Sequence, residues 1–270
     1  MKINGRAIAS DILASVRAEL SGTPMVRAIT LQPSIATTSY LRIKVEKAEE
    51  AGMHMDIVEL ADDASLEDIV AAVEAPGADA VIIQLPLPLG YDTEKAVNAI
   101  PVSKDPDVLS STAYAQFEEG VEGALVPPVA AAVLEVLHRE KIDVQGMRTV
   151  VVGKGQLVGR PVATVLTRLG ADVTTVVKET PNKEALYKQA DLIVSGAGAA
   201  HIITPEMVKE GVLLIDAGTS GSRGGVAGDI HPDCETRAAL FTPVPGGIGP
   251  IAVACLFKNT AALFSRIQKQ

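Results

Sequence analysis

The chain has 270 residues, which is enough for one large domain or two smaller ones. Its 33 acidic and 24 basic residues give a formal net charge of -9, so we expect no nucleic-acid partner, because nucleic-acid binding requires a basic surface. Aromatic residues make up only 3% of the chain, which argues against a stacking platform for single strands.

Residues that could bind a metal are few and scattered. The two cysteines, Cys234 and Cys255, cannot form a disulfide framework or a four-thiolate zinc site. The histidines show no ligand spacing, so we expect no metal. No stretch of about 18 uncharged apolar residues occurs, so we expect no membrane span and a cytoplasmic protein.

Strand and helix patterns alternate in the first half of the chain. Residues 25–31 form a short apolar run that predicts a buried strand, and a helix follows at 37–51, ending before Gly52. Strand patterns at 56–60 and 80–85 enclose a predicted helix at 65–74. This alternation predicts a parallel sheet with helices on its faces.

The pattern restarts near residue 125. It predicts helices at 130–140, at 162–169 and from 250 to the end, and strands at 149–152, 172–177, 192–195 and 212–215. We therefore expect a two-lobed α/β fold. The first domain comprises residues 1–125 and is completed by the helix at 250–270, and the second comprises residues 126–249.

A glycine-rich turn follows the first strand of the second domain. Residues 149–161 read TVVVGKGQLVGRP, with Gly153 at the strand end, then Gly155 and Gly159, and Pro161 in the first helical turn. Small residues let backbone amides approach a pyrophosphate at a helix N-terminus. The spacing G-x-G-x-x-x-G differs from the dinucleotide fingerprint, so a tight turn without a ligand is the alternative.

Charged residues near this turn favour one cofactor over another. Lys154 and Arg160 belong to the turn, and Lys178 and Glu179 follow the next predicted strand. Bases at this place accommodate a 2′-phosphate, whereas an acid binds a ribose 2′-hydroxyl. Three bases near one acid favour NADP over NAD. The alternative is that the lysines are ordinary solvated surface residues.

Several polar residues of the first domain could carry chemistry. Tyr40 and Lys44 are four residues apart and share a helix face, although such a pair is more often a surface coincidence. Gln84 follows a predicted strand, where open α/β sheets place ligands, and two prolines stiffen the loop QLPLP after it. Asp107, in KDPD, could accept hydrogen bonds from a ring or be a surface turn residue.

A rigid loop precedes the last helix. Residues 242–250 read TPVPGGIGP, a pattern that brings backbone close to a ligand or simply forms a structural turn.

In this order, these motifs resemble the bifunctional methylenetetrahydrofolate dehydrogenase/cyclohydrolase family. The resemblance runs from NGRAIA at 4–9 to FKNTAAL at 257–263 and is most specific in SYLRIK, VIIQLPLP, VVVGKGQLVGRP and TPVPGGIGP. It implies a folate-binding catalytic domain and a Rossmann-type NAD(P)-binding domain. It also implies oxidation of 5,10-methylenetetrahydrofolate with NADP, with NAD as the alternative cofactor, and hydrolysis of the methenyl product to 10-formyltetrahydrofolate.

The resemblance also assigns roles to residues. It implies that Lys44 is the general acid/base, that Tyr40 stacks on the pterin, that Gln84 tunes Lys44 and that Asp107 anchors the pterin nitrogens. It further implies a homodimer in one-carbon metabolism and purine biosynthesis. The implied folate-contacting residues include Tyr40, Gln84, Leu85, Pro86, Asp107, Pro243, Gly246 and Gly247, and the implied cofactor-binding residues are Gly153, Lys154, Gly155, Val158, Gly159, Arg160, Pro161, Lys178 and Thr219.

The chain departs from the family pattern mainly on the cofactor side. The departures are Val108 in place of Gly, Val129 and Ala130 in place of Thr and Pro, Gly155 in place of Ser, Val177 in place of His and Ala252 in place of Thr. The folate-handling residues are all present. The cyclohydrolase is therefore the firmer implication, and a cyclohydrolase-only enzyme is the first alternative. A non-catalytic binding or assembly protein and a dehydrogenase for another small substrate are the others.

Overall fold

The chain folds into two compact units. The structure, a computed structural model, describes residues 1–222 and 225–268. The three-stranded unit comprises Ser10–Pro128 and the chain from Val253 onward, and the five-stranded unit comprises Met1–Ala9 and Val129–Ala252. Helices α1 (Gly5–Glu19) and α9 (Ile248–Ile267) each contribute residues to both units.

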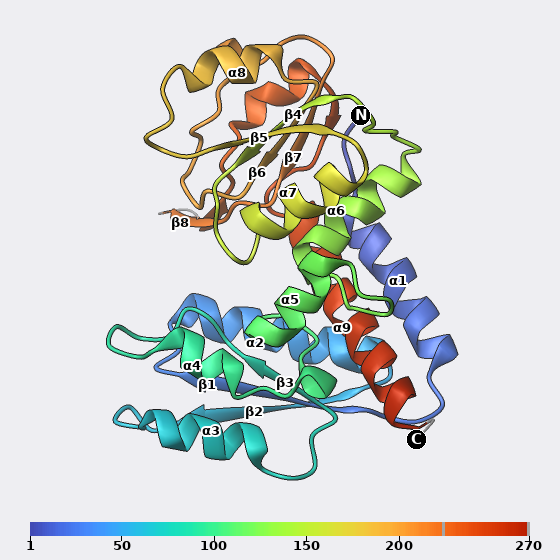
Figure 1. The fold of residues 1–270 in the computed structure, drawn as a ribbon, viewed down its shortest axis with the longest axis vertical. Coiled ribbons are helices and arrows are strands. Elements are labelled where there is room, and N and C mark those ends of the chain that lie inside the picture. The colour runs from blue at the N-terminus through green and yellow to red at the C-terminus, as the bar shows by residue number, and fades with distance from the viewer. Residues whose placement is uncertain (223–224, 269–270) are drawn as a thin grey trace. The chain divides into compact units, whose positions relative to one another are not determined.

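A parallel sheet in the order β2-β1-β3 forms the centre of the three-stranded unit. Helix α2 lies on one face of this sheet and α3 on the other (Figure 1). Alternate residues such as Ile29 and Val81 face α3, where they pack against Ile69 and Val73. The elements are β1 (Met25–Leu31), α2 (Ile35–Glu50), β2 (His54–Leu60), α3 (Leu66–Glu74), β3 (Ala80–Ile83), α4 (Thr93–Asn98), the 3-10 helix Val102–Lys104 and α5 (Ser111–Glu119).

The five-stranded unit contains a second parallel sheet, in the order β10-β7-β6-β4-β5. Helix α7 packs on one face beside α6, and α8 packs on the opposite face (Figure 1). The elements are α6 (Pro128–Arg139), β4 (Arg148–Val152), α7 (Gly159–Arg168), β5 (Asp172–Val176), α8 (Lys183–Gln189), β6 (Leu192–Ser195), β7 (Val212–Asp216), the hairpin β8 (Ser220–Ser222) and β9 (Gly225–Ala227), β10 (Ala238–Phe241) and the 3-10 helices Pro205–Met207 and Pro232–Thr236.

The strand order of this sheet has one reversal. The chain passes from β4 outward to β5 and then crosses to β6 on the other side of β4. In doubly wound sheets, ligands bind outside the carboxyl ends of the strands at such a switch point. The expected α/β class, with parallel strands and helices on the sheet faces, is therefore confirmed.

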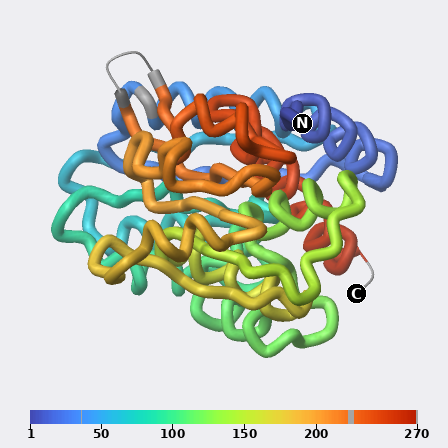
Figure 2. Tube along the Cα trace, turned by 90° about the horizontal axis from the view of Figure 1, so that it is seen from above, coloured from blue at the N-terminus to red at the C-terminus, as the bar shows by residue number. Residues whose placement is uncertain are grey.

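The N-terminal residues differ from the expected division of the chain. Residues 1–9 were assigned above to the first domain, but they belong to the five-stranded unit. Lys2 forms a bridge with Phe241, and the Ile3 amide donates to the Phe241 carbonyl at 2.9 Å. Figure 2 shows the blue N-terminal end next to the orange-red segment that contains Phe241. Because these bonds extend the sheet edge at β10, the N-terminus folds with β10.

Helix α9 is apolar along most of its length. Among the described residues it is the one helix long and apolar enough to cross a membrane, and more than half of that apolar window is buried in the protein. Its buried side chains include Ile251, Phe257 and Leu263. Core packing therefore accounts for its hydrophobicity.

Candidate active site

A buried lysine meets a glutamine at the edge of the three-stranded sheet. Helix α2 begins after Ser34, whose hydroxyl accepts a hydrogen bond from the Thr37 amide, and it carries Lys44 nearly three turns further along. Lys44 is 6% exposed, and its Nζ donates to Gln84 Oε1 at 3.1 Å. The Gln84 Nε2 donates to the Leu85 carbonyl at 2.8 Å, which turns Oε1 toward the lysine.

Tyr40 lies one helical turn before Lys44 on the same face. The Lys44 Nζ is 5.2 Å from the centre of the Tyr40 ring, within the range of a cation–π contact. Tyr40 as a whole is 40% exposed, so part of its ring surface is open to a ligand. The predicted pair of Tyr40 and Lys44 is thus brought together by the i, i+4 spacing.

Asp107 supplies negative charge to this cluster. It lies in the loop between the 3-10 helix Val102–Lys104 and α5, and its residue surface is half-buried. Burial raises the pKa of the Asp107 carboxyl, and the nearby Lys44 opposes that shift. Burial lowers the pKa of Lys44, and the charge of Asp107 opposes this. The two groups therefore lie close enough to affect each other's charge.

The tyrosine hydroxyl stays protonated over the whole physiological range. Burial of the hydroxyl end, together with the charge of Asp107, raises the pKa of Tyr40 to about 12. By contrast, burial lowers the pKa of Lys44, which shifts it toward the range in which an amine can act as a base. Chemically, the cluster offers one proton-transfer group, Lys44, held by a neutral amide and placed beside a tyrosine ring and a carboxylate.

The glycine-rich turn links β4 to α7 in the five-stranded unit. Gly153 has a φ of +100°, and a Cβ on Gly159 would lie 2.1 Å from the Gly153 carbonyl oxygen. Only glycine permits this approach of the helix to the strand. Gly155 faces open space, and Val158 precedes α7 without a side-chain cap. The turn therefore packs closely between β4 and α7 at Gly153 and Gly159 and leaves open space at Gly155, which fits a phosphate-binding turn.

Two lysines lie at the same edge of this sheet. Val152 of β4 pairs in register with Val176 of β5, and the Gly153 amide donates to the Val176 carbonyl at 2.8 Å. Lys154 and Lys178 each follow these paired residues by two positions, and both are exposed, as is Arg160. The register therefore places Lys154 and Lys178 just beyond the same end of neighbouring strands.

The remaining predicted residues are divided between the two units. Leu85 and Pro86 follow Gln84 in the three-stranded unit. Pro243, Gly246 and Gly247 lie in the five-stranded unit, where the Gly5 amide donates to the Gly246 carbonyl at 2.9 Å. Thr219 is exposed in the loop after β7, and Pro161 is buried in the first turn of α7.

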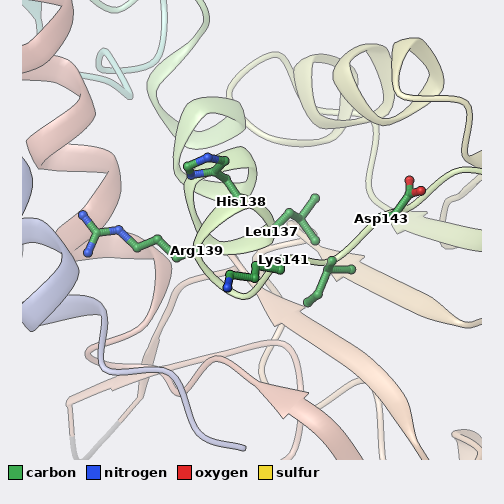
Figure 3. Close-up of a pocket in the computed structure, with 6 residues that line it drawn as sticks. Leu137, His138, Arg139, Lys141 and Asp143 are labelled. Atoms are coloured by element: carbon green, nitrogen blue, oxygen red, sulfur yellow. The ribbon is translucent and has the colours of Figure 1, made fainter.

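A cavity elsewhere in the five-stranded unit involves none of these residues. It has a volume of about 520 Å³ at the C-terminal end of α6 and is lined by Leu137, His138, Arg139, Lys141, Ile142 and Asp143 (Figure 3). The labelled Arg139 and Asp143 side chains point away from each other, so they do not form a common binding site. Within residues 1–222 and 225–268, no three His, Cys, Asp or Glu side chains are placed to hold a metal ion.

Two polar residues near Asp107 were missed by sequence reasoning. Asp105 is buried and accepts hydrogen bonds from the start of α5, and Asn259 reaches the same loop from α9. For Asn259 the signal is that an Asn inside an apolar helix requires buried partners, whereas no local pattern marks Asp105.

One departure from the family pattern has a direct structural consequence. Val108 stands where Gly is expected and has a φ of +58°, the left-handed region that β-branched residues avoid. It is also 1% exposed, so its side chain is part of the core. The family glycine is thus replaced by a residue that gains burial and accepts backbone strain.

The fold and the site define a class. In the three-stranded unit, a buried amine with a lowered pKa lies at the end of a parallel strand. In the five-stranded unit, a glycine-rich turn follows a strand of a doubly wound sheet. This combination describes an α/β protein with a proton-transfer site and a nucleotide-binding type of fold.

Comparisons with known proteins identify the family. Residues 3–107 match the tetrahydrofolate dehydrogenase/cyclohydrolase catalytic domain, and residues 127–268 match the NAD(P)-binding domain of the same family. The bifunctional protein FolD of Methanospirillum hungatei is 34% identical over 269 residues, covering 97% of this chain and 96% of that protein. The chain belongs to the tetrahydrofolate dehydrogenase/cyclohydrolase family.

Solved structures agree with this assignment. The dehydrogenase-cyclohydrolase (FolD) of Trypanosoma brucei, complexed with NADP cofactor and inhibitor, superposes with a TM-score of 0.93 at 31% identity, covering 100% of this chain and 99% of that chain. The Campylobacter jejuni FolD enzyme superposes with a TM-score of 0.93 at 26% identity, covering 98% and 99% of the two chains.

Proposed function

We propose that this chain catalyses both reactions of its family. It oxidises 5,10-methylenetetrahydrofolate with NADP and hydrolyses the resulting 5,10-methenyltetrahydrofolate to 10-formyltetrahydrofolate. The observation that carries the proposal is the buried Lys44, which donates to Gln84 beside Tyr40 and Asp107 in a chain that also has a glycine-rich turn for a dinucleotide. Nothing observed favours a cyclohydrolase-only enzyme.

Hydrolysis needs a positioned base more than a metal. The methenyl carbon is already cationic and electrophilic, so the difficult step is delivering water to it. Neutral Lys44 accepts a proton from water as the new C–O bond forms, and it returns that proton to the ring nitrogen as the C–N bond breaks. The hydroxyl proton leaves to solvent when the formyl carbonyl forms. Burial favours the neutral amine that this step requires.

The other residues of the cluster orient the substrate and the base. Gln84 holds the Lys44 amine through a hydrogen bond whose direction is fixed by the Leu85 carbonyl. Tyr40 has an exposed ring surface on which a flat pterin can stack. Asp107, whose raised pKa permits a shared proton, accepts hydrogen bonds from the pterin nitrogens.

The five-stranded unit fits a dinucleotide. A Cβ at Gly159 would collide with the turn, whereas the space in front of Gly155 is open. The pyrophosphate would be held by the first turn of α7 and by the glycines of the turn, Gly153, Gly155 and Gly159. It would be bordered by Val158, Arg160, Pro161 and Thr219. When bound, NADP accepts the hydride of the dehydrogenase reaction.

We propose that Lys154 and Lys178 favour NADP over NAD by binding the 2′-phosphate. The β4–β5 register that brings them to one edge supports this. Replacing both lysines with Ala is expected to raise the KM for NADP much more than the KM for NAD. Steady-state rates with each cofactor measure the effect, and an equal change in both KM values would contradict the proposal.

The direct test of the reaction uses the purified protein with methylenetetrahydrofolate and NADP or NAD, followed at the methenyl absorbance. The Lys44→Gln variant is expected to lose cyclohydrolase activity. Lys47→Gln, at a partly exposed position of the same helix where the lysine pairs with Glu50, is the matched control and should retain it. An unchanged cyclohydrolase rate in Lys44→Gln would overturn the mechanism.

We also propose that the protein acts as a homodimer in the cytoplasm and supplies 10-formyltetrahydrofolate for purine biosynthesis. The family assignment supports this. Sedimentation of the purified protein tests the dimer, and a monomer at micromolar concentration would contradict it.

A further inference from the structure

The loop that carries Asp107 is tied down on its C-terminal side. The Asp105 carboxylate is buried and accepts hydrogen bonds from the Leu109 amide at 3.2 Å, the Ser110 amide at 2.8 Å and the Ser110 hydroxyl at 2.7 Å. These bonds fold the chain back over residues 105–110 and join the loop to the start of α5. They leave Asp107 at the middle of a closed turn.

A second tie comes from a distant part of the chain. Asn259 of α9 donates from its Nδ2 to the Pro106 carbonyl at 2.9 Å and to the Val126 carbonyl at 2.9 Å. Both partners are acceptors only, so the amide nitrogen must face them. Asn259 is 9% exposed, and all of these residues belong to the three-stranded unit. The residue immediately before Asp107 is therefore held by the C-terminal helix.

The backbone immediately after Asp107 is strained. Val108 occupies the left-handed region at φ +58°, a conformation that persists only when the surrounding structure fixes it. The Asp105 and Asn259 hydrogen bonds provide that restraint on either side. If one tie is lost, relaxation of Val108 toward an ordinary conformation would move Asp107.

We propose that Asn259 is a positioning residue for the cyclohydrolase reaction, which holds Asp107 at its working distance from Lys44. The inference rests on the proposed roles of Lys44 and Asp107. The Asn259 amide donates to the Pro106 and Val126 carbonyls and not to Lys44 or Asp107. It acts through the Pro106 carbonyl, and no role for it followed from the family motifs.

The position of Asp107 matters because its charge acts on Lys44. Asp107 raises the pKa of Lys44 against the lowering caused by burial. The titratable groups around this pair are Tyr40 on the face of α2 and Asp105, whose charge acts on Asp107. If Asp107 moves away from the amine, the pKa of Lys44 falls further. The limb of the cyclohydrolase pH profile that reports Lys44 then moves to lower pH, whichever protonation state is active.

The test measures kcat/KM for cyclohydrolysis across pH in the full-length protein. Asn259→Leu removes the amide donor to both carbonyls but keeps the branching and the number of heavy atoms of the side chain in a largely apolar helix. We expect kcat/KM to fall by about 10- to 100-fold and the Lys44 limb to move to lower pH. Asp107→Asn, which removes the charge outright, shows how far the limb moves when the charge of Asp107 is lost.

Asn98→Ala is the matched control. Asn98 Oδ1 accepts from the Ser111 amide at 2.7 Å and the Ser111 hydroxyl at 2.9 Å, so its loss weakens the start of α5 in the same unit without touching the 105–107 loop. It should lower stability and leave the limb in place.

The outcomes separate the two hypotheses. Suppose that Asp107→Asn moves the Lys44 limb of the pH profile, but Asn259→Leu leaves that limb where it lies in Asn98→Ala. Asn259 is then only structural, and the inference is overturned while the proposed function stands. If Lys44→Gln keeps its rate and Asp107→Asn leaves the profile unchanged, the proposed roles fail, and the inference fails with them.

Discussion

At the scale of single residues, burial has changed what ordinary side chains do. Lys44 is 6% exposed and has a lowered pKa, so a residue that is usually a solvated charge becomes a candidate base. At Val108 burial affects the backbone instead: the side chain is buried, and the backbone adopts the left-handed conformation that a β-branched residue avoids. Asp216 is buried at the end of β7 beside Asp229, where two acids share one neighbourhood.

The strain at Val108 predicts an unusual order of stability. Val108→Gly should be more stable than Val108→Ala by about 1 kcal/mol, because Ala retains the penalty of a positive φ and Gly does not. At Val97, a buried residue of α4, the same pair of substitutions should show the reverse order by a similar amount. Thermal or urea unfolding of the four variants measures both differences. A higher stability of Val108→Ala than of Val108→Gly would contradict the strain.

The buried Asp216 predicts a pH-dependent cost. Burial, with the charge of Asp229, raises the pKa of Asp216 from 3.8 to about 7. Between these values the folded state keeps a proton that the unfolded state releases, so the stability of the wild type falls as pH rises, by at most about 1.4 kcal/mol per pH unit. Relative to Asp216→Asn, which cannot ionise, the wild type should lose stability from about pH 4 to 7 and then level off.

Asp191 provides the contrast of opposite sign. Its hydrogen bond with Lys209 lowers the pKa of Asp191 to about 2. Its contribution to stability is therefore present above 3.8, its ordinary pKa, and is lost as pH falls through about 2. Urea unfolding midpoints across pH compare Asp216→Asn with the wild type, and parallel curves for the two would refute the raised pKa of Asp216.

At the scale of elements, the site depends on where helices start and how closely they approach strands. The i, i+4 spacing on α2 places Tyr40 over Lys44, and the end of β3 brings Gln84 to the same amine. In the other unit, α7 can approach β4 only because Gly159 has no side chain.

This close approach separates the two activities. Gly159→Ala would place a Cβ 2.1 Å from the Gly153 carbonyl oxygen, so the turn must open, and we expect a large loss of dehydrogenase activity. Cyclohydrolase activity, which depends on the other unit, should be kept. Gly155→Ala separates packing from ligand contact: a Cβ there meets nothing within 4 Å, so the turn should keep its shape, and any loss of dehydrogenase activity would report contact with the cofactor. Both rates are measured on the same preparations, and equal loss of both activities in Gly159→Ala would contradict the division.

At the scale of the whole molecule, an acidic protein must bind an acidic cofactor. The net charge of -9 repels NADP at long range, and in the proposed binding mode Lys154 and Lys178, at one sheet edge, would attract it locally. We expect the KM for NADP to rise more steeply with salt than the KM for NAD, because the Debye length falls from about 10 Å at 0.1 M to about 3 Å at 1 M. Steady-state rates at several salt concentrations check this. Replacing both lysines should give the KM values for NADP and NAD the same salt dependence. If the two KM values already rise in parallel with salt in the wild type, the proposed lysine contacts are contradicted.

Much of the fold could be predicted from local pattern. The strand at 25–31 matches β1 in full, and the strands at 192–195 and 212–215 match β6 and β7 to within a residue, because short apolar runs in parallel sheets are distinctive. The N-terminal helix α1 was not predicted, and residues 1–9 fold with β10, since a backbone bridge between Lys2 and Phe241 leaves no trace in side-chain pattern.

In the candidate site too, some features follow from local sequence pattern and others do not. The pairing of Tyr40 with Lys44 follows from helical spacing, and the positions of Gln84 and Gly153 follow from strand ends. The hydrogen bond of Asn259 to Pro106 spans more than a hundred residues, and no local pattern encodes its partner.

The sequence by itself determined the α/β class, the resemblance to a folate-dependent family, the glycine-rich turn and the residue types available for proton transfer. Only the tertiary structure decided that Lys44 is buried, that Lys154 and Lys178 share one sheet edge and that Val108 is strained beside Asp107. The physical reason is that residue type and spacing are local properties, whereas desolvation, charge proximity and backbone strain depend on which distant segments pack together.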